Sequence, residues 1–306
     1  MEIYQLEIFY CLARTLSFSK TADEVHISQP SVSGHISSLE KSLGVQLFIR
    51  NTKGVSLTKA GDDFLVYAQK ILSLRDKAVQ SVNGDYLNIN ASIDIISSTI
   101  PAQHLLPEII SSFQKLRPNI IFNVEQADSR RVEQEMGGFR YDFGMIGTKP
   151  NTERFNFLPV YDDELVLVIP KSTQQKIKSI RENFAEYIIK TPFIMRETGS
   201  GTRVEIEGLL AKIDVDPNAL KIPAYFSDAH SILLAVTCGM GVSLISKVAA
   251  SMYVQAGLLS AVEMKDPLFK RQIYLLYNKE RWLSPVQQAF ADHARNFYSN
   301  GSITGK

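Results

Sequence analysis

The chain has 306 residues, of which 45% are hydrophobic and 21% charged, with a formal net charge of +1. This length predicts two or three domains, and the composition is that of a soluble globular protein. The sequence contains no run of about eighteen apolar residues, and its acidic start does not suit a secretory signal, so we expect a cytoplasmic protein. Cys11 and Cys238 are the only cysteines and lie far apart, which predicts neither a disulfide framework nor a metal site.

Three helices are predicted in the first 45 residues. Dense apolar residues in 3–15 favour a buried first helix, and Ser17 or Ser19 can open the second. In the third, one face carries Val32, Ile36, Leu39 and Leu43 at helical spacing. Its start is well specified because a serine can cap the first turn and the missing N–H of a proline costs nothing there.

The opposite face of the third helix is small and polar, as a helix in a DNA major groove requires. Strands at 45–48 and 54–57 then predict a hairpin, or wing, whose tip is basic, and no acidic residue occurs between Lys41 and Lys59. An ordinary surface helix pair in an α-helical domain is the alternative. The candidate DNA-binding residues are Ser28, Gln29, Pro30, Ser31, Ser33, His35, Arg50 and Lys53.

A long amphipathic helix is predicted to follow the wing, starting near residue 59. Phe64, Ile71 and Ala78 lie seven residues apart, and Leu65, Leu72 and Val79 repeat the spacing beside them. A seven-residue stripe on a protruding helix is best buried against a copy of itself, so we expect a dimerising linker. The alternative is that this helix folds back onto its own domain. Asn and Gly in residues 83–90 predict a boundary after it.

Beyond residue 90, strand-like and helix-like runs alternate. This alternation predicts an α/β domain with mainly parallel sheets, long enough for two lobes with a cleft between them. Ligands collect outside the carboxyl ends of strands in such sheets. The expected strands are 93–96, 120–124, 143–146, 165–169, 193–195, 242–244 and 273–277, with helices at 105–116 and 231–238.

Hydroxyl-bearing and glycine residues occur where this cleft is expected. Residues 196–203, RETGSGTR, precede a helical run, and the free N–H groups at a helix start can bind an anion. Two further segments end strands with Ser or Thr. The alternative is that these residues only cap helices. The candidate effector-binding residues are Ser98, Thr99, Thr148, Thr198, Gly199, Ser200, Gly201 and Thr202.

No catalytic, metal or cofactor site is predicted. The five histidines are scattered without metal-ligand spacing, and neither cysteine has an adjacent base. The glycines in 239–241 lack the spacing of a dinucleotide-binding loop.

The N-terminal sixty residues resemble the LysR-type transcriptional regulators. Carrying the resemblance are Leu6, Phe9, Ala13, Ser17-Phe18, Ala22, Ser28-Gln29-Pro30, Val32-Ser33, Leu39-Glu40, Leu43-Gly44, Leu47-Phe48, Arg50, Leu57-Thr58 and Ala60-Gly61. It continues through LLPEIISSF, YDFGMIG, SDAHSIL to GMGVSLI, and LSPVQQAF. Gly34 stands where members commonly carry a larger side chain, and Thr21 replaces a usual Ala.

The resemblance implies a bacterial regulator with a winged helix-turn-helix domain in 1–58, a dimerising linker helix and hinge in 59–90, and an effector-binding domain in 91–306. That domain would resemble a periplasmic binding protein, with lobe I in about 91–162 and 268–306 and lobe II in about 163–267. The implied assembly is a homotetramer, a dimer of dimers.

The RETGSGTR and SSTIPAQHLLP segments resemble the branch of the family that regulates cysteine and sulfur metabolism, which implies a sulfur-containing oxyanion as effector. The leading hypothesis is therefore a transcriptional regulator that binds double-stranded promoter DNA and responds to a small anionic effector. The alternative is a small-molecule binding protein or a transferase whose N-terminal helices serve only dimerisation.

Overall fold

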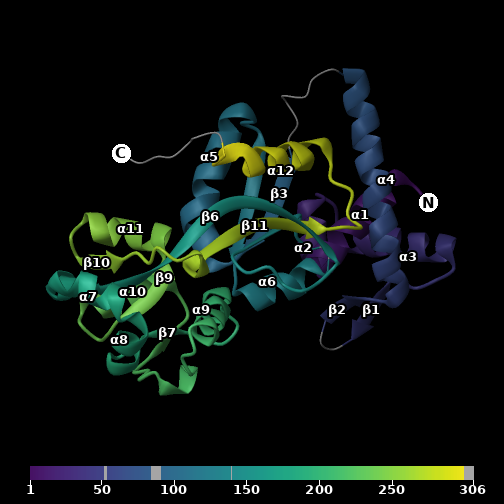
Figure 1. Cartoon of the computed structure of the whole chain (residues 1–306). Helices are drawn as coiled ribbons and strands as arrows, with labels where there is room; N and C mark the ends of the chain where they lie inside the picture. The colour runs from purple at the N-terminus through teal and green to yellow at the C-terminus, as the bar shows by residue number, and fades with distance from the viewer. Residues whose placement is uncertain (52–53, 84–90, 139, 300–306) are drawn as a thin grey trace.

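The computed structural model describes residues 1–51, 54–83, 91–138 and 140–299. Within these residues the chain forms an N-terminal winged helix-turn-helix, a long helix and a two-lobed α/β domain (Figure 1). The predicted fold class is therefore confirmed. No helix among the described residues is long and apolar enough to span a membrane.

The N-terminal unit is a three-helix bundle closed by a two-stranded wing. Its core includes Phe9, Leu12, Ile36 and Leu39, all of them fully buried. The predicted capping is confirmed: Ser28 Oγ accepts a hydrogen bond from the Ser31 N–H at 3.3 Å. The bundle consists of α1 (Ile3–Thr15), α2 (Phe18–Glu24) and α3 (Gln29–Leu43).

The wing consists of β1 (Phe48–Asn51) and β2 (Gly54–Leu57), which pair antiparallel. The strand predicted at 45–48 was wrong, because regular structure begins only at its last residue. The carboxylate of Glu40 accepts hydrogen bonds from the Leu47 and Phe48 amides at 2.7 and 3.2 Å. These bonds turn the backbone back toward α3 before the strand starts. The wing tip with Lys53 lies outside the described residues.

The long helix α4 (Lys59–Asn83) spans 25 residues, which corresponds to about 37 Å. The first half of its predicted stripe packs on its own domain instead of facing outward, as the alternative proposed: Leu65 is 2% exposed, and the Phe64 ring lies 5.0 Å from that of Phe9. Tyr67 and Leu74, also seven residues apart, are each 62% exposed. In the first half of α4 the outward apolar residues are thus not those of the predicted stripe, whereas Val79 of that stripe is 52% exposed.

Lobe I is built on a parallel core of three strands, with β3 in the middle. Helices α5 and α12 pack against each other and share the buried contact of Phe113 with Phe290, whose ring centroids lie 5.4 Å apart. The elements are β3 (Ala91–Ser97), a π-helical turn (Pro101–Leu105), α5 (Leu106–Leu116), β4 (Ile120–Gln126), α6 (Ser129–Met136), β5 (Phe143–Ile146) and α12 (Pro285–Phe297).

Two long strands, β6 (Phe155–Pro170) and β11 (Lys270–Asn278), connect the lobes and pair antiparallel. The second half of β6 pairs antiparallel with β9 (Ser243–Ser246) and β10 (Leu259–Val262). The prediction of mainly parallel sheets was therefore wrong for this region. The chain enters lobe II through β6 and returns through β11, and adjacent strands that leave and return run in opposite directions.

Lobe II packs its helices around a second core that includes Leu167, Phe193 and Ile206. Its remaining elements are α7 (Ile177–Glu182), α8 (Phe184–Lys190), β7 (Met195–Arg196), α9 (Gly201–Lys212), β8 (Tyr225–Phe226), α10 (Ala229–Thr237) and α11 (Lys247–Gln255), with short 3-10 turns at Lys171–Lys176, Pro217–Ala219 and Pro267–Phe269.

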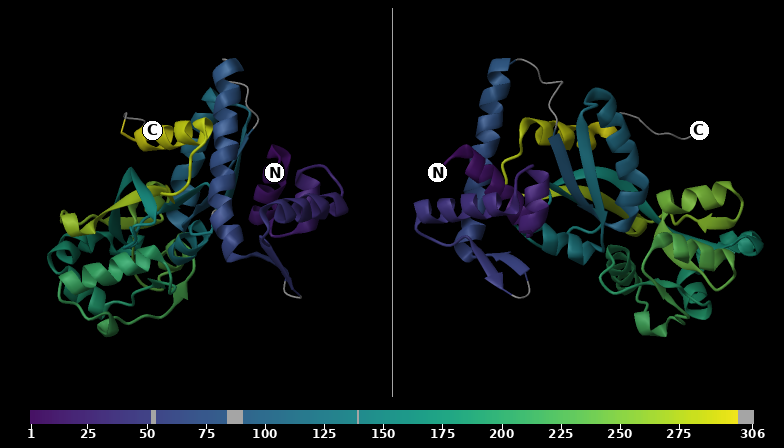
Figure 2. Two further views of the ribbon diagram at one scale, coloured as in Figure 1. Left: turned by 90° about the vertical axis from the view of Figure 1, so that its right-hand side faces the viewer. Right: turned by 180° about the vertical axis from the view of Figure 1, so that it is seen from behind.

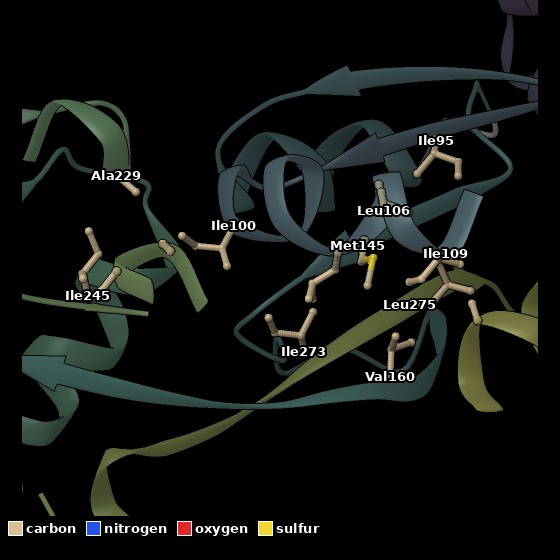
Figure 3. Close-up of a cluster of buried hydrophobic side chains, with 14 of the residues drawn as sticks. Ile95, Ile100, Leu106, Ile109, Met145, Val160, Ala229, Ile245, Ile273 and Leu275 are labelled. Atoms are coloured by element: carbon tan, nitrogen blue, oxygen red, sulfur yellow. The ribbon is translucent and has the colours of Figure 1, made fainter. Parts of the chain in front are cut away.

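The largest apolar cluster extends from lobe I into lobe II along the connecting strands (Figure 3). Leu106 and Met145 belong to lobe I, Ile245 belongs to lobe II, and Ile273 lies on β11 between them. The lobes are therefore joined by a continuous core at the strands. Relative motion of the lobes has to occur by bending around this core.

The winged-helix unit contacts lobe I through buried and partly buried polar groups, and its helices lie beside one end of the lobe I sheet in both views of Figure 2. Arg14 on α1 donates to Asp94 on β3 at 2.5 Å. Arg281, which is 6% exposed, donates to the hydroxyl of Tyr10 on α1 at 3.0 Å and forms an ion pair with buried Asp142. These contacts fix the N-terminal unit against lobe I.

We predict that Arg14→Met lowers the free energy of unfolding by about 1–3 kcal/mol. The carboxylate of Asp94, whose side chain is only 15% exposed, would lose a charged hydrogen-bond donor. Arg131→Met is the matched control: Arg131 pairs with Glu125 at the surface, with side chains 47% and 34% exposed. We expect a loss below about 1 kcal/mol for that exposed pair. Urea denaturation followed by circular dichroism measures both, and equal losses would contradict a docking role for Arg14.

Candidate DNA-binding face and effector cleft

The start of the predicted DNA-binding helix, α3, is exposed. Ser28, Gln29, Pro30 and Ser31 are all exposed, and the two serine hydroxyls lie 2.7 Å apart. These four residues can face outward because the apolar residues of α3 face the bundle core. This end of α3 offers hydroxyl and amide groups of the kind that contact base edges.

The other candidate residues in this unit also have contacts within the protein. Arg50 Nη1 donates to Ser33 Oγ at 3.3 Å, and its guanidinium lies 4.2 Å above the ring of Phe18. His35 is partly buried and meets the edge of Tyr4, with ring centroids 5.3 Å apart. Arg50 therefore joins the wing to α3 and holds a positive charge beside the helix surface.

The second site is a cleft between the lobes. Ser98 and Thr99 follow β3, and Asp128 and Ser129 start α6 on the same side. Lobe II contributes Arg196 and the start of α9, and Arg271 enters from β11. The free volume in the cleft is about 20 Å³, enough for about one water molecule. The lobes are thus already in close contact around the site.

Five of the eight predicted effector residues line this cleft, namely Ser98, Thr99, Ser200, Gly201 and Thr202. Thr148 bridges the lobes, because its hydroxyl donates to the Gly201 carbonyl at 3.1 Å. Gly199 adopts φ +101 in the turn before α9, a conformation that favours glycine. Thr198 is directed elsewhere and accepts a hydrogen bond from Arg203 at 3.3 Å.

Arg196 was not among the predicted site residues, although it is 3% exposed and lines the cleft. Its Nε and Nη2 atoms donate to Glu197, and Nη2 also donates to the Ser227 carbonyl at 3.0 Å. Within the described part of the chain, Nη1 has no hydrogen-bond partner. Burial alone would raise the pKa of nearby Asp228, but hydrogen bonds from Ser231 and the charge of Arg196 lower it overall.

Arg271 also lines the cleft and was not among the predicted site residues. It forms an ion pair with Asp163 at 2.8 Å, in which the side chains are 5% and 1% exposed. Asp163 also accepts a hydrogen bond from the Ser246 hydroxyl at 2.7 Å. The remaining Nη1 of Arg271 donates to Thr202 Oγ at 3.2 Å. Asp163 therefore holds Arg271 where it faces the start of α9.

Asp128 was also absent from the predicted site residues, and both it and Arg196, which lies in the predicted 196–203 segment, had a usable signal in the sequence. Asp128 follows the carboxyl end of β4, as Ser98 follows that of β3, so the same strand-end rule would have found it. Arg271 lies inside a strand, and nothing in its local sequence separates it from an exposed strand residue. Its place in the cleft depends on the antiparallel pairing of β11 with β6, which sets Arg271 opposite Asp163.

The fold and the two sites together define a winged helix-turn-helix DNA-binding protein with a two-lobed ligand-binding domain. Two family models match the chain: the LysR substrate binding domain over residues 89–299, and the bacterial regulatory helix-turn-helix protein of the lysR family over residues 3–62. The chain belongs to the LysR family of transcriptional regulators.

Similar curated proteins are also transcriptional regulators. An uncharacterized HTH-type transcriptional regulator from Methanocaldococcus jannaschii is 32% identical over 278 residues, covering 91% of this chain and 93% of the relative. A probable RuBisCO transcriptional regulator from Nostoc is 30% identical, with coverages of 94% and 86%. The HTH-type transcriptional activator CmpR from Synechocystis is 26% identical, with coverages of 95% and 94%. The protein is a regulator and not an enzyme, so the transferase alternative is excluded.

Solved structures agree with the fold. Full-length OxyR from Pseudomonas aeruginosa has a TM-score of 0.74 at 19% identity, covering 96% of this chain and 95% of that one. Full-length CbnR in complex with its target DNA has a TM-score of 0.56 at 20% identity, with coverages of 97% and 99%.

Among the residues that the structure describes, no group of three His, Cys, Asp or Glu side chains could hold a metal ion.

We predict that Gly201→Ala disturbs the contact between the lobes. An added Cβ would lie 2.6 Å from Ser129 Oγ and 2.9 Å from Thr148 Oγ1, so the lobes would have to separate, at a cost of about 1–3 kcal/mol. Gly208→Ala on the same helix is the control, because nothing lies within 4 Å of its added Cβ. It should stabilise the protein by roughly 0.5–1 kcal/mol. Urea denaturation measures both changes, and a neutral Gly201→Ala would mean that the lobes are not in contact there.

Proposed function

We propose that the start of α3 reads promoter DNA and that the cleft binds a small effector carrying an anionic group, with a sulfur-containing oxyanion among the candidates. The observation that carries the effector site is the burial of Arg196 and Arg271 together in the cleft. Around them, Ser98 and Thr99 offer hydroxyl groups. Guanidinium and hydroxyl donors suit carboxylates and oxyanions.

The DNA-binding proposal separates sequence reading from phosphate binding. The exposed Gln29 and Ser31 would contact base edges, while Arg50 would bind a phosphate beside α3. Arg50 is suited to this role because Phe18 and Ser33 fix its guanidinium at the helix surface. The whole set of eight candidate residues in the N-terminal unit belongs to this proposal, including Lys53, which lies outside the described residues.

Effector binding would act on the lobe contact. Thr148 and Arg271 already bridge to the start of α9, and the cleft has little free volume. An effector larger than one water molecule has to replace these bonds and separate the lobes slightly. The effector would therefore shift the protein between two lobe arrangements by binding one of them better.

Assembly is proposed to occur through α4. Tyr67 and Leu74, each 62% exposed, form an apolar stripe that its own domain leaves uncovered. Burial of this stripe against a second copy would give a dimer with two reading helices, as an inverted-repeat promoter site requires. Pairing of such dimers would give the homotetramer.

We predict different effects for two variants in the DNA-binding unit. Gln29→Ala should reduce discrimination between specific and random duplexes by about 1–3 kcal/mol, because it removes a base-edge contact. Arg50→Ala should weaken binding to both duplexes and reduce the slope of log K against log salt by about 0.9. Gln175→Ala, an exposed glutamine in lobe II, is the control. Fluorescence anisotropy over a salt series measures all three, and equal losses on both duplexes for Gln29→Ala would show that this residue reads no base.

We also predict that Leu74→Asp reduces the oligomeric state, because it would place an unpaired charge in the dimer contact at a cost of about 3–5 kcal/mol. Its side chain is 62% exposed in the single chain, so the fold should tolerate the change. Val204→Asp, at an apolar position on α9 that is 53% exposed, is the matched control. Light scattering after size exclusion gives the masses. An unchanged mass for Leu74→Asp would rule out this stripe as the dimer contact.

A further inference from the structure

The two arginines of the cleft are each paired with a carboxylate. Arg196 is paired with Glu197 at 2.9 Å, and Arg271 is paired with Asp163 at 2.8 Å. Asp128 also lines the cleft and has no ion pair within the described residues. With Asp228, which lies near Arg196, the side chains at the site carry two positive and four negative charges.

The N-terminal ends of helices offset most of this excess negative charge. Helices α6 and α9 both start at the cleft, and the N-terminal end of a helix carries roughly half a positive charge. Together they offset the unpaired carboxylate of Asp128, and the start of α10 offsets part of the charge of Asp228, which caps that helix. The cleft is therefore close to electrically neutral, and a doubly charged anion such as sulfate would meet no net positive charge in it.

The unpaired groups lie at separate points of this neutral site. Asp128 Oδ1 caps α6 by accepting the Arg131 N–H at 3.0 Å, whereas Oδ2 has no partner in the described ranges. The carboxylate lies beside Gly199, where an added Cβ would be 3.2 Å from Oδ1. The unpaired donor is Nη1 of Arg196, a residue that is 97% buried, and the hydroxyl of Ser98 also lacks a partner there. The cleft thus offers one acceptor and a separate set of donors.

We propose that the effector is a small α-amino acid, whose carboxylate binds Arg196 Nη1 and the hydroxyls of Ser98 and Thr99, and whose ammonium group binds Asp128. This inference rests on the proposed effector function of the cleft and narrows its ligand to a zwitterion. A zwitterion satisfies both kinds of unpaired group and adds no net charge. Asp128 is then the residue that selects for the ammonium group.

The test compares ligands that differ only at this group. Glycine, L-alanine and L-serine are titrated against glycolate, L-lactate and L-glycerate, in which a hydroxyl replaces the ammonium, with sodium sulfate as a further probe. Isothermal titration calorimetry on the full-length protein gives the affinities. At least one amino acid should bind about tenfold or more tightly than its hydroxy acid, as a charge-assisted hydrogen bond implies.

Asp128→Asn tests the residue itself, because asparagine caps a helix as well as aspartate and so preserves α6. This variant should lose the preference for the amino acid and leave the affinity for the hydroxy acid unchanged or higher. Asp162→Asn is the matched control: Asp162 is an exposed aspartate on the connecting strand β6, outside the cleft, and accepts a hydrogen bond from Gln272. It should keep the preference of the wild type.

The outcomes separate this inference from the proposed function. Equal or tighter binding of the hydroxy acids or of sulfate would overturn the zwitterion and leave the anion site standing. An amino-acid preference that survives in Asp128→Asn would also overturn the inference. If no amino acid, hydroxy acid or sulfate binds the wild type, the inference fails together with the proposed effector site.

Discussion

The pairing of β6 with β11 is the constraint on which the two-lobed domain depends. The two strands form nine residue pairs, from Lys270 opposite Glu164 to Asn278 opposite Phe155. The buried ion pair between Asp163 and Arg271 locks this ribbon where it passes the cleft, and removing one partner of such a pair costs about 3–5 kcal/mol. The register shifts between Ile273 and Tyr274, and an irregularity of this kind bends and twists a strand. Motion of the lobes is therefore expected as a twist of the ribbon near this shift, with Arg271 carried along beside the effector.

Strand β3 brings the two functions of the protein close together. Asp94, which anchors Arg14 of the winged-helix unit, lies four residues before Ser98, which faces the cleft. Four residues of extended strand span about 13 Å. The strand is held on both sides by parallel pairing with β4 and β5, so it moves as one unit. A displacement of its end by the effector would act on the docking contact of the DNA-binding unit, with no need for a longer chain of side chains.

The sequence predicted those features that local rules govern. The cap at Ser28 and the apolar face of α3 follow from residue type and helical spacing, and Ser98 follows from its position at a strand end. Arg271 could not be found in this way, because its place in the cleft depends on β6 and β11 pairing across more than a hundred residues of chain. The strand predicted at 45–48 failed for a similar reason: Glu40, on the preceding helix, binds the amides of Leu47 and Phe48. Contacts distant in sequence therefore account for most of what the patterns missed.

The outward face of α4 shows why a repeat alone does not identify a partner. Successive residues of a helix are rotated by about 100°, so residues seven apart lie close to one line along it. Phe64 and Ile71 form one such line and pack on the core of their own unit, while Tyr67 and Leu74 form another that stays exposed. The two lines are separated by roughly a sixth of a turn. A helix that packs on its own domain and on a second copy needs apolar residues on both faces, which explains why the first half of the predicted stripe packs on the core while a second apolar line stays exposed.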